Sequence, residues 1–407
     1  MTPPGVAVTG IGLVTAGGIG REATWQRVCS GAGTAAPSPE LHDLPVDFCC
    51  TVPPLDQALA PLRRKAWRLD RCAQIALIAA REAVADAALD PAAWDAARVG
   101  VVLGTGFGGT GTLWAQQARL RDKGPELVSA LLHPRSMANM PAGEVALEFG
   151  ALGPSLATVT ACASGADALV AARGWLLAGL CDIVLAGGTE AGNTPLNVVG
   201  FHQLGTLSGR RDDPASASRP FDADRDGFVM AEAAAVLVLE RAGHARARGA
   251  PVRAVLAGCG ASTDAHHPTA PHPGGAGARR ALRQALTAAG VSSREVGHVN
   301  AHGTGTPLGD TIEARVISDC LPHGPSVTAT KGVLGHSLGA AGAVEAAVTV
   351  LTMQHAVVPP VANLRRAGPD VSVDLVLDEP RRQQVDLAVS NSFGFGGHNT
   401  VLVFHRP

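Results

Sequence analysis

Two long helical segments that are apolar on nearly every side constrain the fold of this chain most strongly. Residues 164–180 and 338–354 have the composition of helices and carry few charged side chains. Helices without a polar face are normally buried between other layers of a protein. Strand-like apolar runs alternate with helical patterns along the rest of the chain, which predicts an α/β layered fold. Because one buried helix falls in each half, we expect two similar lobes that face each other.

The remaining elements are expected from apolar periodicity and from glycine and proline boundaries. The expected strands are residues 5–9, 98–103, 183–186, 235–240, 252–258, 298–300, 327–330, 386–390 and 400–404. The expected helices are residues 69–88, 164–180, 276–289, 311–320 and 338–354. Segments 208–219 and 261–277 are predicted as surface loops, and the second is long enough to predict a functional loop.

Composition excludes several classes of protein. Of 407 residues, 46% are hydrophobic and 17% charged, which excludes a disordered chain. A net charge of -2, 3% aromatic residues and no Tyr argue against a nucleic-acid-binding surface. No apolar run reaches the roughly 18 residues of a membrane helix, and residues 1–4 do not resemble an export signal. The eight Cys form no C-x-x-C pair, so we expect a cytoplasmic protein with free thiols.

Two motifs match ligand-binding patterns only in part. Residues 104–109 (Gly-Thr-Gly-Phe-Gly-Gly) satisfy G-x-G-x-x-G, but Asp122, at the distance of the ribose-binding acid, does not end a strand. Residues 222–227 match the first half of a calcium loop, but Ala233 stands where the bidentate Glu is required. We therefore expect a tight glycine loop and an Asp-rich turn held by Arg225.

Three histidines close together in the sequence suggest a metal site only superficially. His266, His267 and His272 lie in a proline-rich loop without a nearby carboxylate or Cys. A loop face is the better interpretation, and no metal is expected.

A serine-nucleophile motif is the strongest alternative to the site described below. Residues 335–339 (Gly-His-Ser-Leu-Gly) match G-x-S-x-G, and Asp386 and His398 follow Ser337 in the order of a hydrolase triad. A nucleophile elbow needs its strand immediately before the motif. Here the expected strand ends near Thr330, so a serine acyltransferase that uses Ser337 is a minor alternative.

Cys162 is the best candidate nucleophile. It lies in residues 160–165 (Thr-Ala-Cys-Ala-Ser-Gly), where the first buried helix begins. The partial positive charge and the unpaired N–H groups at a helix N-terminus favour a thiolate. The competing interpretation is an inert buried Cys, which is the more common fate of a free thiol.

Two histidines and a lysine at glycine-rich junctions are the expected partners of this thiol. His302 follows the strand at 298–300, so it projects at the carboxyl edge of a sheet, where ligands of α/β proteins collect. Lys331 and His336 precede the second buried helix. The dipole of that helix disfavours imidazolium, so we expect His336 to be a neutral hydrogen-bond donor.

Five segments of the chain resemble the beta-ketoacyl-acyl carrier protein synthases, which are condensing enzymes of fatty acid and polyketide synthesis. They are residues 160–165, 219–228, 300–310, 331–342 and 391–399. The resemblance covers essentially the whole chain and implies a thiolase-type fold, with two similar lobes in an α-β-α-β-α arrangement. It implies an N-terminal lobe at 1–255 with the nucleophile and a C-terminal lobe at 256–407 with both histidines.

The resemblance also implies a decarboxylative Claisen condensation. Cys162 takes an acyl chain as a thioester, and His302 and His336 donate to the thioester oxygen of malonyl carrier protein. The backbone N–H groups of Cys162 and Phe395 form the oxyanion hole. Lys331 and Glu345 belong to the network that supports these groups. Lys331 is also expected to be one of the catalytic residues.

The remaining implied positions surround this centre. They are Thr304 and Thr306 for the phosphopantetheine arm, Phe393, Gly394, Phe395 and Gly396 for a gate, and Phe107 and Phe201 for the acyl pocket. Cofactors are not required, since the acyl carrier protein supplies the pantetheine. We expect the acidic carrier to dock near Arg63, Arg64, Lys65 and Arg68, where positive charge is concentrated.

Departures from the family pattern suggest a specialised enzyme. Ala231 and Ala233 replace two glycines, which implies that neither position has a positive φ. His398 stands where Thr is common in fatty acid synthases. A type II polyketide or polyene pathway is therefore preferred over primary fatty acid synthesis, and the dimer is either a homodimer or a heterodimer with a chain-length factor.

Two rival functions share the same fold. A non-catalytic chain-length-factor-like subunit usually lacks the nucleophilic Cys, and Cys162 is present. A thiolase uses a second Cys near the C-terminus, and the chain has no Cys after Cys320.

Overall fold

One continuous sheet runs through the whole molecule. The computed structural model describes residues 5–407, in which a 12-stranded sheet is built from two halves. The N-terminal half has the strand order β6-β5-β7-β8-β1, with β2 (Gly18–Ile19) beside β1. Its strands are β1 (Val6–Thr15), β5 (Val99–Gly104), β6 (Ser155–Thr158), β7 (Ile183–Glu190) and β8 (Ala233–Arg241).

The C-terminal half repeats this order as β11-β10-β15-β16-β9, followed by β13 (Asp374–Leu375) at the outer edge. In both halves the first three strands are parallel to one another and the last two pair antiparallel. The strands are β9 (Ala254–Thr263), β10 (His298–Asn300), β11 (Ser326–Thr328), β15 (Leu387–Gly394) and β16 (His398–His405). The two lobes expected from the sequence are therefore confirmed as repeats of one topology.

A short ladder joins the halves. Val6, Ala7 and Val8 of β1 pair with residues 254–256 of β9. The expected division into residues 1–255 and 256–407 stays a prediction, since the sheet runs across that boundary without a break.

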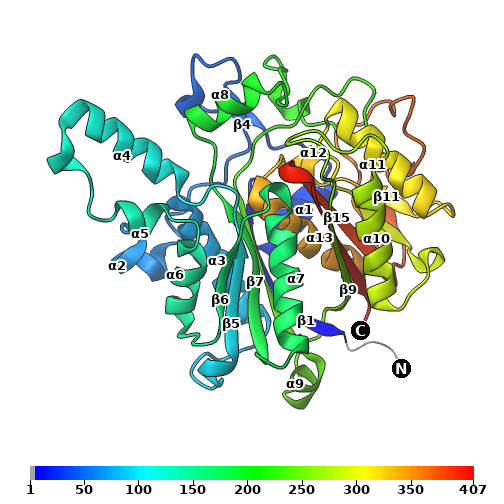
Figure 1. Cartoon of the computed structure of the whole chain (residues 1–407), viewed down its shortest axis with the longest axis horizontal. Coiled ribbons are helices and arrows are strands. Elements are labelled where there is room, and N and C mark those ends of the chain that lie inside the picture. Colours follow the sequence, from blue (N-terminus) through cyan, green and yellow to red (C-terminus); the bar gives the residue numbers. More distant parts are fainter. Residues whose placement is uncertain (1–4) are drawn as a thin grey trace.

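Helices cover both faces of each half-sheet in an α-β-α-β-α arrangement (Figure 1). The central layer contains α7 (Ser164–Leu177) and α13 (Ala341–His355), which pack against strands of both halves. The outer layers contain α3 (Arg71–Asp86) and α6 (Met140–Phe149) on one side, and α10 (Ala276–Ala289) and α11 (Pro307–Cys320) on the other. Strands buried on both faces explain the continuous apolar runs in the sequence.

The two central helices begin in the same way. Each follows a 3-10 turn, η5 (Ala161–Ala163) before α7 and η8 (Leu338–Ala340) before α13. The first residue of each turn has a left-handed backbone, with φ of 51° at Ala161 and 45° at Leu338. L-residues other than Asn and Asp seldom adopt this conformation, so the sharp turn is a specific feature of both halves.

Glycines allow these helices to approach closely. A Cβ atom on Gly165 would lie 2.8 Å from the backbone N of Ala343, and one on Gly342 would lie 2.8 Å from the backbone N of Ala166. Any side chain at Gly165 or Gly342 would force the helices apart, which fixes the distance between the two lobes at the site described below.

Several elements were not expected from the sequence. They are α4 (Thr110–Lys123), α5 (Leu132–Ser136), α6, α8 (Pro195–Gln203) and β6. Partial exposure gives β6 and α8 mixed polar and apolar patterns that resemble loops. The remaining short elements are α1 (Arg21–Cys29), α2 (Arg63–Ala66), α9 (Ala242–Ala247), α12 (Lys331–Leu334), β3 (Ala36–Pro37), β4 (Phe48–Cys49), β12 (Val357–Val358) and β14 (Arg381–Arg382).

The first of the two segments predicted as surface loops is partly buried. Segment 208–219 is a surface loop in its middle, where residues 209–216 are exposed or half-buried, but Ser208, Ser218 and Arg219 at its ends are buried. The prediction from polarity fails at these ends because their side chains have partners inside the protein, such as the Lys331 carbonyl that accepts from Ser218. Within residues 5–407, no helix is both long and apolar enough to cross a bilayer.

Candidate active site

A cavity of ≈ 590 Å³ lies at the junction of the two lobes. This volume is typical of small-molecule sites. Most residues singled out in the sequence line it, whereas Lys331 and Glu345 are buried behind the wall. The lining includes Phe107, Cys162, Phe201, His302, Thr304, Thr306, His336, Phe393, Gly394 and Phe395.

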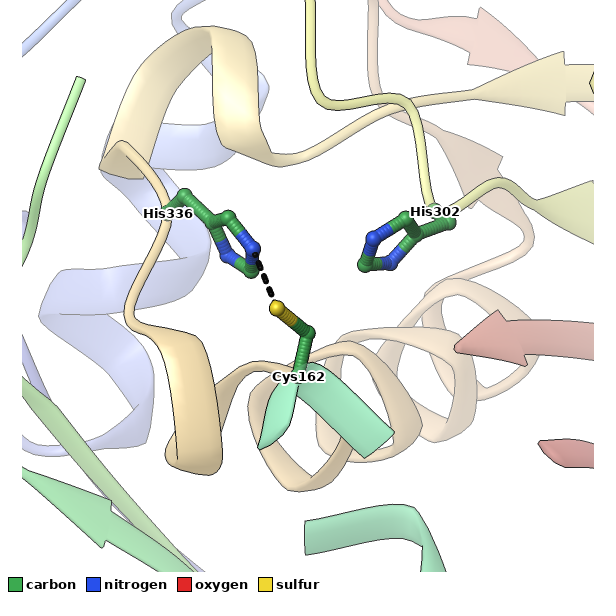
Figure 2. Close-up of side chains that lie close together, drawn as sticks. All are labelled: Cys162, His302 and His336. Carbon is green, nitrogen blue, oxygen red and sulfur yellow. Dashed lines mark hydrogen bonds between the residues drawn. The ribbon is translucent and has the colours of Figure 1, made fainter. Parts of the chain in front are cut away.

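Cys162 lies between the two histidines (Figure 2). Its Sγ is 3.1 Å from Nε2 of His336, and the thiol and both rings have ligating atoms within 4.8 Å of one another. Cys162 comes from η5 in the N-terminal half, whereas both histidines come from the C-terminal half. The site therefore exists only because the two lobes pack face to face.

Burial makes the resting thiol a weak acid. Loss of solvation raises the pKa of Cys162 to about 11, while Lys331 and the N–H of Phe395 act in the opposite direction. The sequence-based expectation of a thiolate favoured by the helix N-terminus was wrong for the resting protein. Loss of hydration of the charged sulfur is the largest contribution to this shift, and it opposes the thiolate.

His336 is held as a neutral ring with its proton on Nε2. Its Nδ1 accepts the backbone N–H of Leu338 at 3.3 Å, which leaves the proton on the nitrogen that faces Cys162. Its backbone is fixed between the N–H of Ala231 and the carbonyl of Val229, at 3.0 and 2.7 Å. Burial, and then Lys331, hold the pKa of His336 well below its usual range, so the neutral donor expected from the sequence agrees with the structure.

His302 is oriented by groups on two other elements. The carboxylate of Glu313, on α11, accepts the backbone N–H groups of His302 and Gly303, each at 2.8 Å. Nζ of Lys331 lies 3.3 Å from Nδ1 of His302 and donates to its carbonyl oxygen at 2.7 Å. Burial, then Lys331 and His336, place the pKa of His302 well below its usual range. We assign a neutral ring that also carries its proton on Nε2.

A buried ion pair supports His302 from behind. Lys331 and Glu345 form a salt bridge in which both side chains are almost fully buried. Burial raises the pKa of Glu345 to about 7, against the opposing effect of Lys331. The pair holds a positive charge next to His302 without exposing it to the cavity.

Unpartnered oxygen atoms occur on Glu345 itself and on the strands β10 and β15. Oδ1 of Asn300, Oε2 of Glu345 and the hydroxyls of Ser390 and Ser392 are buried and lack a hydrogen-bond partner within residues 5–407. Buried oxygens of this kind are satisfied by an ordered water molecule or by a small hard cation.

The gate segment approaches Cys162 through its backbone. The backbone N–H of Phe395 acts on the sulfur of Cys162 by lowering its pKa, and its place in an oxyanion hole stays a prediction. A Cβ atom on Gly394 would lie 2.6 Å from the carbonyl oxygen of Thr160 and 3.1 Å from the backbone N of Cys162. Only glycine allows this approach. Gly396 has a φ of 81° and donates to the carbonyl of Pro268 at 2.7 Å.

The loop before α10 borders the cavity, as its length suggested. Residues 269–271 and Gly275 line the wall, and the backbone N–H of Asp264 donates to the carbonyl of Gly397 at 2.9 Å. The amide of Asn399 also donates to Asp264, at 2.9 Å. The loop and the gate therefore support each other.

Thr304 and Thr306 lie on one wall of the cavity, at the N-terminus of α11. Their hydroxyl oxygens are 2.9 Å apart. The turn between them is fixed by Asp310, which accepts the N–H of Gly305 at 3.1 Å. Both hydroxyls lie where a polar arm that extends from Cys162 would find hydrogen-bond partners.

Aromatic rings also line the cavity. Phe201 is central, with ring centroids 6.1 Å from Phe107, 5.4 Å from Phe228 and 6.3 Å from Phe395. Phe228 continues this row to His336, at 5.1 Å. The apolar wall therefore runs from the catalytic centre to the expected acyl pocket.

The incomplete motifs have structural roles. The N–H groups of Gly106 and Phe107 donate to the carboxylate of Glu190, so the glycine loop binds a side chain of its own chain. Asp222 accepts the N–H groups of Arg365 and Arg366, and Arg225 donates to the carbonyl of Asp222. The Asp-rich turn held by Arg225 is confirmed.

The serine motif lacks the geometry of a nucleophile elbow. The helix α12 stands between β11 and Ser337. Asp386 is exposed and pairs with Arg406 at 3.5 Å. These features give Ser337 no activated triad.

The expected carrier patch is only partly free. Arg63 and Arg64 on α2 are exposed, but Lys65 pairs with Glu148, and Arg68 pairs with Glu144 at 3.3 Å. Ala231 and Ala233 have no positive φ, as expected.

Sequence reasoning missed several supporting acids. Glu190 is distant in sequence from the backbone N–H groups that it accepts, and Asp264 is distant from Asn399. Glu313 and Asp310 instead accept backbone N–H groups that lie only a short distance before them in the sequence. The signal available was position: Glu313 and Asp310 are one helical turn apart, directly after the glycine-rich segment that carries His302.

Comparison with family models covers most of the chain. The model for the N-terminal domain of beta-ketoacyl synthase matches residues 4–245, and the model for the C-terminal domain matches residues 253–365. Curated relatives carry the name 3-oxoacyl-[acyl-carrier-protein] synthase 2. The protein of Synechocystis sp. is 41% identical over 406 residues, which is 98% of each chain. That of Vibrio harveyi is 38% identical over 414 residues, again 98% of each chain.

Solved structures agree along the full length. A beta-ketoacyl synthase from Burkholderia phymatum superposes with a TM-score of 0.93 at 31% identity, and the ishigamide ketosynthase/chain length factor with 0.92 at 31%. A type II polyketide ketosynthase in complex with its acyl-carrier protein reaches 0.92 at 30%. All three matches cover 100% of both chains. The chain therefore belongs to the beta-ketoacyl synthase family, with the thiolase-type fold that its sequence predicted.

Proposed function

We propose that this protein joins an acyl chain on Cys162 to the two-carbon unit of a malonyl carrier protein, with loss of carbon dioxide. The observation that carries the proposal is the pair of neutral histidines, both of which present Nε2–H toward the sulfur of one buried cysteine. Two fixed donors that converge on one point are suited to stabilise an oxygen that becomes negative during reaction.

The first half-reaction loads Cys162. Its sulfur attacks the carbonyl carbon of an acyl thioester, and the N–H groups of Cys162 and Phe395 stabilise the tetrahedral oxyanion. The carrier then leaves as a thiol. The proton that it takes up balances the proton that the Cys162 thiol lost. The apolar row that includes Phe201 receives the acyl chain.

The second half-reaction generates the carbon nucleophile. Nε2–H of His302 and of His336 donates to the thioester oxygen of malonyl carrier protein. The electron pair of the carboxylate-bearing C–C bond moves into the thioester to form an enolate, and carbon dioxide departs. The enolate carbon attacks the acyl-Cys162 carbonyl, and collapse of the second oxyanion releases the sulfur, which takes up a proton.

The polar and gating residues deliver the substrates. Thr304 and Thr306 hydrogen-bond the phosphopantetheine arm, and the gate at Phe393, Gly394, Phe395 and Gly396 opens the way to Cys162. We propose no further cofactor, because the carrier supplies the reactive thioester. The carrier docks through Arg63 and Arg64 with Lys65 and Arg68 beside them.

A partner subunit is also proposed, either a second copy or a chain-length factor. The chain-length-factor alternative is supported by the structural relatives, since they include a ketosynthase/chain length factor. The preference for a polyketide or polyene pathway stays a prediction. The curated relatives named 3-oxoacyl-[acyl-carrier-protein] synthase 2 share 37–42% identity with this chain.

Labelled malonyl carrier protein tests the function directly. With an acyl primer, wild-type protein should release labelled carbon dioxide and form a chain longer by two carbons. Transfer of intact malonyl groups without release would instead indicate an acyltransferase. Mass spectrometry should place the acyl adduct on Cys162, and a Cys162→Ala protein that still elongates would refute the mechanism.

A second variant separates the two half-reactions. Cys162→Gln should lose elongation but continue to release carbon dioxide from malonyl carrier protein, because both histidines remain in place. Loss of both activities in a folded Cys162→Gln protein would mean that the histidines do not act independently of the thiol.

A further inference from the structure

A buried carboxylate connects the acyl pocket with the turn that follows His336. Glu190 ends β7 and is fully buried. One of its oxygens accepts the N–H groups of Gly106 and Gly339, at 2.6 and 3.1 Å. The other accepts the N–H of Phe107 at 3.3 Å and the hydroxyl of Thr105 at 3.2 Å. Four donors from two separate segments therefore converge on one side chain.

The repeat of the two lobes gives this position a specific meaning. Cys162 is the second residue of η5, and Gly339 is the second residue of η8, so the two are counterparts. In one half the backbone N–H at this position belongs to Cys162 and is a proposed donor to the oxyanion of the reaction. In the other half, the equivalent N–H of Gly339 donates to Glu190. The carboxylate occupies the counterpart of the anion site at which the reaction develops negative charge.

The counterpart position has no room for a catalytic side chain. A Cβ atom on Gly339 would lie 2.2 Å from the backbone N of Gly106 and 2.5 Å from the carbonyl carbon of Thr105. The turn at 105–107 packs directly on η8 because Glu190 binds the N–H groups of both. This contact fixes Phe107, the next residue of the turn, at the wall of the cavity.

We propose that Glu190 is a positioning residue for acyl-chain selection, which holds the Phe107 turn against the catalytic C-terminal half. This inference rests on the proposed function. Without the carboxylate, the three backbone N–H groups lose their acceptor, and the turn is free to move away from η8. Phe107 then retreats from the cavity, and longer acyl chains fit.

The charge of the group agrees with this role. Burial raises the pKa of Glu190 to about 7, while the N–H groups of Gly106, Gly339 and Phe107 favour the ionised form. An ionised carboxylate accepts all four hydrogen bonds. The side-chain amide of a glutamine at position 190 would instead point its own N–H at one of the backbone N–H groups, and two donors cannot hydrogen-bond to each other.

The test compares acylation of Cys162 by butyryl and dodecanoyl pantetheine thioesters, followed by mass spectrometry of the intact protein. Acylation does not need the condensation step, so this test separates the inference from the proposed function. In Glu190→Gln we expect the dodecanoyl/butyryl rate ratio to rise by about four- to fifteenfold, comparable to the burial of one or two additional methylene groups.

A matched control and a double variant test whether the effect is specific. Glu240 is also fully buried and accepts several hydrogen bonds, and it lies at the opposite end of the β7–β8 ladder from Glu190. Glu240→Gln should leave the ratio unchanged. In a Phe107→Ala background, Glu190→Gln should add little, because the side chain through which it acts is absent.

A second variant keeps the inference testable if Glu190→Gln does not fold. Thr105→Val removes one donor to Glu190 and also the acceptor of the Gly108 N–H, at 3.0 Å, and should shift the ratio in the same direction by less. A folded Glu190→Gln protein with an unchanged ratio, or with equally reduced rates for both thioesters, overturns the inference. A wild-type protein that is acylated on Cys162 but never releases carbon dioxide would overturn the proposed function alone.

Discussion

The ammonium group of Lys331 lies 3.3 Å from Nδ1 of His302 and donates to the carbonyl oxygen of the same residue at 2.7 Å. A permanent donor at Nδ1 keeps the ring proton on Nε2, the nitrogen that faces the cavity. His336 reaches the same state differently, through the backbone N–H of Leu338. One catalytic ring is therefore oriented by a buried charge and the other by the main chain, and the two should differ in their sensitivity to mutation.

Lys331→Met should reduce malonyl decarboxylation and stability together. The substitution removes the donor to His302 and leaves the Glu345 carboxylate buried without its partner. Loss of one member of a buried ion pair costs roughly 3–5 kcal/mol. Urea unfolding and carbon dioxide release would measure the two effects.

The double variant Lys331→Met/Glu345→Gln separates these causes. It should recover part of the stability, because no charge is left unpaired, but not the decarboxylation rate. Recovery of both would show that Lys331 has only a structural role.

Alkylation of Cys162 should accelerate continuously with pH. Burial raises the thiol pKa to about 11, so at neutral pH the thiolate is the minor form, and its fraction grows by about tenfold for each pH unit below the pKa. Iodoacetamide rate constants measured from pH 7 to 9 by mass spectrometry of the Cys162 peptide would show this slope. A plateau near neutral pH would mean that the site stabilises the thiolate far more than burial opposes it.

Phe107→Ala should extend the range of acyl primers. Phe107 lines the cavity and contacts Phe201 edge to face, so its removal opens space at the apolar end. Overpacking in a protein interior costs about 1–3 kcal/mol, enough to change chain preference by roughly ten- to a hundredfold. Chain-length profiles with carrier-bound primers and the dimer dissociation constant decide the outcome. An unchanged profile with a weaker dimer would identify Phe107 as an interface residue.

Charge reversal on α2 and at Arg68, just after it, should weaken use of the carrier without damaging the site. The triple variant Arg63→Glu, Arg64→Glu and Arg68→Glu should raise the apparent KM for carrier-bound substrate, since the acidic carrier meets like charge. Acylation by a small pantetheine thioester should stay the same. Raising the salt concentration should reduce the difference between wild type and variant. Equal losses with both donors would reject docking at this helix.

Gly394→Ala should slow acylation of Cys162 specifically. The added methyl group would lie 2.6 Å from the Thr160 carbonyl oxygen, so the strand must move and carry the Phe395 N–H away from the sulfur. Loss of one donor from an oxyanion hole typically lowers kcat by about 10²–10³.

Gly143→Ala in α6 is the control, since nothing lies within 4 Å of its added Cβ. The control should keep full activity and gain about 0.5–1 kcal/mol of stability. Equal rates of Cys162 acylation in the Gly394→Ala and wild-type proteins would rule out this role for the Phe395 N–H.

The sequence by itself determined which side chains meet and on what kind of fold. Cys162, His302 and His336 each lie at a junction between a strand and a helix that contains glycine, and such junctions lie at one edge of an α/β sheet. The two apolar helices could only be buried, so two similar lobes followed. These conclusions depend only on local patterns, which are present in short segments of the sequence.

Only the tertiary structure decided the electrostatics and the supporting contacts. The pKa of the Cys162 thiol depends on burial by both lobes, so the helix start alone gave the wrong direction for the resting group. Glu190 holds the Phe107 turn across 83 positions of sequence, and His336 meets Cys162 across 174. Side chains brought together over such separations share no local pattern, because their spacing is set by how two complete lobes pack. Desolvation is likewise a property of the packed interior, which no short segment specifies.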